Sequence, residues 1–134
     1  SVGEMLEAEA ALRANNRPRA YQAYLAGIRA NFNKIGVSTS ELNDYLARPS
    51  VAVGEGNLQL DDIFREKYII TYLNPEAWND LRRLDYKIKD FKMPVNAKLP
   101  TFIRRLAYPS SERAENGNNV PAEVSLDTKL WWDQ

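Results

Sequence analysis

The sequence predicts a mainly α-helical protein, and three observations lead to this fold class. Apolar residues recur at helical spacing through most of residues 1–86. Residues typical of helix ends, Ser38 with Glu41 and Gly36, stand at the limits of these stretches. From residue 87 onward the periodicity fades. We therefore expect a helical part over 1–86 and an irregular tail over 87–134 docked on it, in a chain long enough for one domain only.

Residues 3–15 and 18–35 are predicted to form two helices, separated by the Asn15-Asn16 break. Helices joined by so short a turn pack antiparallel. Pro18 suits the first turn of the second helix, where its missing N–H costs nothing, and Gly36 suits a left-handed end. The pair resembles a tetratricopeptide hairpin, with small residues where the two helices would approach closely: Ala8, Ala11 and Ala20.

A third, short helix is signalled by its first residues. Ser38 is followed three positions later by Glu41, which is the pattern of a capping box. Pro49 ends this helix, because proline cannot continue the backbone hydrogen bonding. Residues 49–59 are then expected to be a glycine-containing linker.

Two further helices are expected after the linker. The first runs from about Asp61 to Leu73, and Asn74-Pro75 restarts the second, which covers residues 76–84. The stretch Tyr68–Leu73 is apolar almost all round. A helix with that pattern is usually enclosed, so we expect Tyr68–Leu73 to be buried on several sides.

The tail contains the features that break helices. Asn116–Asn119 is a turn cluster, and Leu99–Tyr108 is the candidate for a short strand. The tail cannot make a core of its own, so it needs the helical part to lie against. Long helices are precluded by prolines spread along it: Pro94, Pro100, Pro109 and Pro121.

The charge and hydropathy of the chain exclude several classes of protein. There are 18 basic and 18 acidic residues, so the net charge is zero and a nucleic-acid partner is not expected. No block of like charge suggests a basic patch for a membrane surface. The apolar runs are far shorter than the roughly 20 residues of a membrane-spanning helix.

The chain contains neither cysteine nor histidine. Disulfides, thiol nucleophiles, Ser-His-Asp triads and zinc sites of the Cys/His type are therefore excluded, and we expect no enzyme, no metal and no cofactor. Two carboxylates suffice for glycoside hydrolysis, which makes Asp61-Asp62 and the pair Glu112 and Glu115 worth weighing. We favour helix-start and turn roles for these acids over catalysis.

Two tryptophan-containing elements supply the candidate ligand-binding residues. Trp78 and Arg82 are four apart on a predicted helix, so the guanidinium can lie over the indole. Trp131-Trp132 lies near the C-terminus. Aromatic faces suit the C–H surface of a sugar, and tryptophan also anchors docked tails. We favour an internal brace and a tail anchor, and we keep as candidate ligand-binding residues Trp78, Arg82, Trp131 and Trp132.

Three stretches in series, with the hairpin at 3–35, resemble the C-terminal part of SusD-like (also called RagB-like) outer-membrane lipoproteins. They are Glu76-Ala77-Trp78 followed by Arg82-Arg83; Arg104-Arg105-Leu106-Ala107-Tyr108-Pro109 followed by Glu112, Asn116 and Asn118-Asn119; and Asp127-Thr128-Lys129-Leu130-Trp131-Trp132-Asp133. The chain begins at Ser1 without an initiator methionine or a signal peptide, and we expect the whole of 1–134 to be one fragment of a larger SusD-like protein.

The resemblance implies a function. Members of the SusD-like family capture glycans, or sometimes peptides, on the extracellular face of the outer membrane and deliver them to a SusC-like TonB-dependent transporter. They do not cleave their ligands. A lipidated N-terminal cysteine, absent from this chain, is their only link to the membrane, and the resemblance assigns no ligand contact to any residue here. The alternatives are a helical protein–protein interaction module that binds no glycan, and a small glycoside hydrolase.

Overall fold

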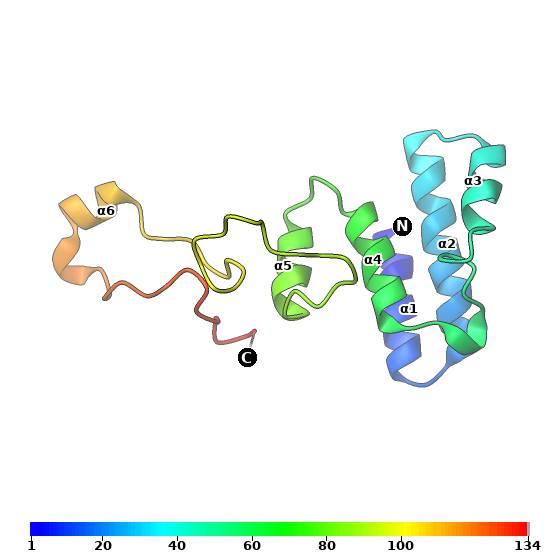
Figure 1. The fold of residues 1–134 in the computed structure, drawn as a ribbon, viewed down its shortest axis with the longest axis horizontal. Coiled ribbons are helices and arrows are strands. Elements are labelled where there is room, and N and C mark those ends of the chain that lie inside the picture. Colours follow the sequence, from blue (N-terminus) through cyan, green and yellow to red (C-terminus); the bar gives the residue numbers. More distant parts are fainter. Residues whose placement is uncertain (134) are drawn as a thin grey trace.

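The computed structural model describes residues 1–133 and confirms the mainly α-helical fold. Within this range the chain forms six α-helices, two short 3-10 turns and no strand (Figure 1). The elements are α1 (Val2–Arg13), α2 (Arg17–Ile35), α3 (Thr39–Leu46), η1 (Glu55–Asn57), α4 (Leu60–Ile70), α5 (Glu76–Arg83), α6 (Ser110–Glu115) and η2 (Gly117–Asn119).

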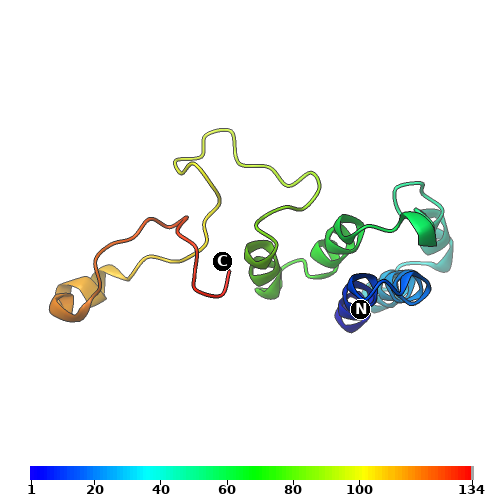
Figure 2. The same ribbon diagram turned by 90° about the horizontal axis from the view of Figure 1, so that it is seen from below.

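Helices α1 and α2 form the expected antiparallel hairpin and lie side by side in both ribbon views (Figures 1 and 2). The Asn16 side chain accepts a hydrogen bond from the backbone N–H of Arg19 and so caps α2. Gly36 ends α2 in the left-handed conformation with φ 74°. Between the helices, a Cβ on Gly27 would lie 2.8 Å from Cε of the buried Met5, so the missing side chain leaves room for this contact.

The capping box predicted for α3 is present. Ser38 Oγ accepts from the backbone N–H of Glu41 at 3.3 Å. In return the Glu41 carboxylate accepts from the backbone N–H of Ser38 at 3.2 Å. Two of the N–H groups that a helix start leaves without an intrahelical partner are thereby satisfied.

The linker between α3 and α4 packs on the hairpin. Val51 and Leu58 are buried in the core. The hydroxyl of the buried Tyr24 donates to the Val51 carbonyl at 3.3 Å, and the Arg17 guanidinium donates to the Gly56 carbonyl at 3.0 Å. Side chains of α2 therefore hold an irregular segment in place and satisfy its carbonyl groups.

The expected burial of Tyr68–Leu73 is wrong. Helix α4 ends at Ile70, and the side chains of Tyr72 and Leu73 are 79% and 87% exposed. The reason is that only one side of α4 faces the other helices, and that side carries the buried Lys67. Tyr68 is covered only in part, by the edge contact of its ring with Phe91 at 5.6 Å, and Ile69 is 49% exposed.

The short strand expected within Leu99–Tyr108 is also wrong, because this stretch is irregular. The backbone N–H groups of Arg104 and Arg105 both donate to the Leu126 carbonyl, at 2.8 and 3.1 Å. Two donors that share one acceptor do not make a ladder, and Pro100 has no N–H to extend one.

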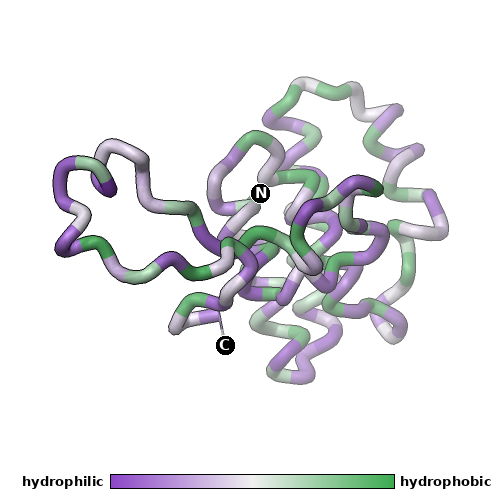
Figure 3. The backbone as a smooth tube through the Cα atoms, turned by 60° about the vertical axis from the view of Figure 1, so that its left-hand side comes forward, coloured by the Kyte–Doolittle hydropathy of each residue, from purple (hydrophilic) through white to green (hydrophobic). Residues whose placement is uncertain are grey.

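The tail is docked on the helical part through aromatic side chains. Hydrophobic segments recur along the tail in Figure 3. The rings of Tyr86 and Phe102 stack with centroids 4.4 Å apart, and Phe91 lies 5.1 Å from Phe102. The short helix α6, which the sequence did not predict, lies at the end of the molecule away from the hairpin (Figure 1).

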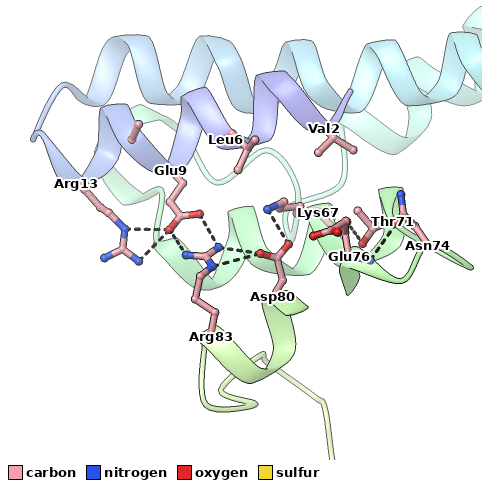
Figure 4. A pocket seen from close by; sticks show the side chains of 11 residues that line it. Val2, Leu6, Glu9, Arg13, Lys67, Thr71, Asn74, Glu76, Asp80 and Arg83 are labelled. Atoms are coloured by element: carbon pink, nitrogen blue, oxygen red, sulfur yellow. Dashed lines mark hydrogen bonds and ion pairs between the residues drawn. The ribbon is translucent and has the colours of Figure 1, made fainter. Parts of the chain in front are cut away.

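A chain of ion pairs joins α1, α4 and α5 (Figure 4). Arg83 of α5 lies 2.8 Å from Glu9 of α1 and 2.9 Å from Asp80. Lys67 of α4 lies 2.6 Å from the other oxygen of Asp80, and Arg13 lies 3.0 Å from Glu9. Glu9 and Lys67 are buried, so each charge depends on these partners.

Burial alone would raise the pKa of Glu9, but the hydrogen bonds and positive charges of Arg83 and Arg13 outweigh it and lower that pKa. The folded pKa therefore lies below the ordinary glutamate value of about 4.3. Ionised Glu9 contributes stability above that value, and the contribution is lost as the pH falls through the folded pKa.

We expect Glu9→Gln to lower the free energy of unfolding by about 1–3 kcal/mol at neutral pH, because Arg83 and Arg13 lose their shared acceptor charge. The difference from the parent protein should shrink as the pH falls below the ordinary glutamate pKa and through the lowered pKa of folded Glu9. Urea denaturation at a series of pH values measures both effects.

The matched control is Glu7→Gln, since Glu7 pairs only with Arg19 at the surface. That variant should lose less than about 0.5 kcal/mol. A loss at Glu9 that stays constant from neutral to acidic pH would contradict the assigned role of the ion pairs.

Candidate functional site

Arg82 of α5 lies between two tryptophan rings. Its guanidinium carbon is 4.0 Å from the centroid of a Trp78 ring, one helical turn away on the same helix. It is 4.7 Å from the centroid of a Trp132 ring, which the tail brings to α5. Three of the four predicted ligand-binding residues are therefore in contact with one another, with the cation over the aromatic faces.

The same guanidinium is hydrogen-bonded to the tail. Arg82 Nη1 donates to the Arg104 carbonyl at 3.0 Å, and Nη2 donates to the side chain of Asn79. Arg82 is buried. A buried arginine needs such acceptors, and these contacts are those expected of an internal brace. Its Nε has no hydrogen-bond partner among residues 1–133.

Trp78 is held by its polar edge. Its Nε1–H donates to the Tyr86 hydroxyl at 3.0 Å and points also at the Ile103 carbonyl at 3.3 Å, and the Tyr86 hydroxyl donates to that carbonyl in turn. Half-buried tryptophan commonly combines an apolar face with a satisfied N–H in this way. The indole of Trp78 is thus part of the contact between α5 and the tail.

Arg104 makes a second junction inside the tail. It is buried, and its guanidinium pairs with Asp85 and, at 3.1 Å, with Asp133 next to the tryptophan pair. The pKa of Asp85 is lowered by hydrogen bonds from Lys87 and Arg104, which outweigh the smaller opposing effect of burial. The closing residues of the described chain are therefore fixed by charge as well as by aromatic contact.

Trp131 differs from the other three candidates. Its side chain is 85% exposed, whereas that of Trp132 is 40% exposed. Trp131 takes part in no aromatic or cation–π contact within residues 1–133. Trp132 therefore belongs to the brace, whereas the ring of Trp131 faces the solvent.

A pocket of about 380 Å³ lies beside the brace. The sequence does not predict that the tail residues Arg105 and Tyr108 line this pocket. They belong to a stretch that resembles the SusD-like family, but nothing local in the sequence shows that the tail folds back over α5. The residues lining this brace pocket are Trp78, Arg82, Arg105, Leu106, Ala107, Tyr108, Pro109 and Leu130.

The acids weighed for catalysis lie on separate elements. Asp62 accepts from the backbone N–H of Gln59 at 3.0 Å and caps α4. Glu112 of α6 accepts from the side-chain amide of Asn116 at 2.6 Å. Asp62 and Glu112 thus have local structural roles of the kind favoured from the sequence.

The chain matches the model of a known protein family. The family described as SusD-like, starch-binding associating with outer membrane, matches residues 2–109. That match covers well over half of the chain, so the protein belongs to this SusD-like family. Searches of curated proteins and of solved structures give no match.

Among the described residues, none of the helices is both long and apolar enough to span a bilayer.

We expect Trp78→Ala to lower the free energy of unfolding by about 3 kcal/mol, because the change removes the indole from Arg82 and leaves a void against the tail. Trp131→Ala is the matched control, and its exposed ring predicts a change within about 0.5 kcal/mol. Chemical denaturation followed by circular dichroism measures both. Equal losses for the two variants would overturn the assignment of Trp78 to the brace.

Proposed function

We propose that this chain is part of a non-catalytic cell-surface protein that captures glycans for a partner SusC-like TonB-dependent transporter. The observation that carries the proposal is the match of residues 2–109 to a starch-binding family that associates with the outer membrane. The protein acts on the extracellular face of that membrane, and a lipid on an N-terminal segment outside this chain holds it there. Nucleic acid is not a partner, because the net charge of zero gives no field to attract phosphates.

Capture without cleavage agrees with the side chains of the chain. It has no cysteine and no histidine, so a thiol nucleophile and the usual base near neutral pH are missing. Asp62 and Glu112, one member of each carboxylate pair to consider for hydrolysis, are engaged in local hydrogen bonds. The proposed function uses no metal and no cofactor.

The surface beside the brace is our candidate for glycan contact. Trp131 presents a mostly exposed ring, and Tyr108, which is 46% exposed, lines the neighbouring pocket. Aromatic rings offer apolar faces to the C–H groups of a sugar, and the Arg105 guanidinium offers donors to its hydroxyls. Trp78, Arg82 and Trp132 support this surface, since the Arg82 guanidinium contacts both indoles.

The test is isothermal titration calorimetry of the chain with a linear α-1,4-linked glucose heptasaccharide. We expect saturable binding that Trp131→Ala weakens at least about tenfold, because the largest exposed aromatic face is removed. Thermal unfolding of the variant should match that of the parent.

Tyr72→Ala is the control for nonspecific loss of an exposed aromatic ring. Tyr72 is 79% exposed and lies on the helical part, away from the brace. Its removal should leave the affinity within about twofold. Unchanged binding in Trp131→Ala would exclude this surface, and absence of binding by the chain would argue against glycan capture by residues 1–134.

A helical protein–protein interaction module is the second candidate, and one observation favours it. A groove of about 510 Å³ runs between α1 and α5 above the ion pairs (Figure 4). Its α1 wall carries the apolar residues Val2, Leu6 and Ala10 at helical spacing, beside the charged Glu9 and Arg13. If this is the function, Leu6→Arg abolishes binding of a helical partner while oligosaccharides bind neither variant.

A further inference from the structure

A third pocket, of about 610 Å³, lies between α5 and the loop of the tail that follows it. This loop runs out from the end of α5 and returns toward it (Figure 2). Almost all of the side chains that line the pocket are apolar or aromatic. We call it the loop pocket, and its principal walls are Trp78, Leu81, Phe91, Met93, Phe102 and Leu126.

The polar atoms of the aromatic lining residues are used elsewhere. Trp78 Nε1–H donates to the Tyr86 hydroxyl at 3.0 Å, and that hydroxyl donates to the Ile103 carbonyl. The ring planes of Tyr86 and Phe102 are within 9° of parallel. A ligand in the loop pocket therefore meets flat carbon surfaces and finds no free aromatic donor, so the interior selects an apolar group.

The polar lining is confined to two residues of the loop. The hydroxyl of Thr101 already donates to Asp127 at 3.2 Å. Lys98 is exposed and forms no ion pair with any residue of 1–133. It is one of four lysines in the segment 87–98, which has a single acid, Asp90. Of these lysines only Lys98 lines the loop pocket, so the rim carries one cation.

We propose that the loop pocket binds a soluble single-chain amphiphile, with an alkyl chain in the aromatic interior and a carboxylate at Lys98. The volume is within the range of about 300–1,000 Å³ that small ligands occupy. An apolar interior with one unpaired cation at its edge matches the two ends of a straight-chain alkanoate. The proposal is independent of the glycan surface, because it uses different side chains apart from Trp78.

The length of the alkyl chain gives the first test. Titration calorimetry of the 134-residue chain with octanoate and decanoate, below their micelle concentrations, should show saturable binding. Burial of each additional methylene strengthens binding by about fourfold. Decanoate has two methylenes more than octanoate, so its dissociation constant should be lower by about tenfold or more. Equal affinities would overturn the assignment of the interior to the alkyl chain.

The carboxylate is tested with variants on the rim. Lys98→Ala should weaken decanoate about fivefold and leave decanol unchanged, whereas Lys98→Arg should retain decanoate binding. Lys92→Ala is the matched control, because Lys92 is on the same loop but does not line the pocket, and it should bind decanoate as the parent does. Equal effects of Lys98→Ala on acid and alcohol would overturn the role of Lys98.

The pocket itself is tested by filling it. Ala97 is exposed and lines the loop pocket, so Ala97→Trp should block binding of both decanoate and decanol while the thermal unfolding midpoint is retained. Full binding by this folded variant would place the amphiphile elsewhere and overturn the proposal. Sedimentation with anionic phospholipid vesicles should be negligible. Sedimentation that Ala97→Trp abolishes would assign the pocket to a membrane lipid and overturn the soluble ligand.

Discussion

The position of the tail depends on one guanidinium. Arg82 is enclosed by the indoles of Trp78 and Trp132, and it donates to a carbonyl group of Arg104. The tail has no helix of more than a few residues within its described part and no strand to give it shape. Its path over α5 is therefore fixed by side chains, and the pocket beside the brace exists only while that path is kept. Both the candidate glycan surface and the loop pocket are built on this contact.

Two junctions of the molecule use different chemistry. Helix α5 is joined to α1 and α4 by ion pairs around Glu9 and Asp80, whereas the tail is joined to the helical part by aromatic rings and a stacked cation as well as by the ion pair of Arg104 with Asp85. Ion pairs that are partly exposed weaken with salt, and apolar contacts strengthen with excluded salts such as sulfate. The junction around Glu9 and Asp80 should thus be more sensitive to salt than the tail junction, to which apolar contacts also contribute.

The sequence could predict the features that depend on residues close to one another in the chain. The capping box at Ser38 and the left-handed Gly36 depend on neighbours within a few positions, and both are present in the structure. The contact between Trp78 and Arg82 also follows from helical spacing alone. The contact of Arg82 with Trp132 does not, because it joins residues that are far apart in the chain, and no spacing rule brings them together. The predicted burial of Tyr72 was wrong for the same reason, since burial depends on which neighbour covers a helix face.

Trp78 is a wall of both pockets on α5. One indole cannot move for a ligand on one side without changing the shape of the space on the other. A ligand that shifts this ring in one pocket therefore alters affinity in the other, and thermodynamic linkage requires the two effects to be equal in size. An apolar molecule held by the loop would in this way act as an effector of the surface that we assign to glycans, through a single shared ring.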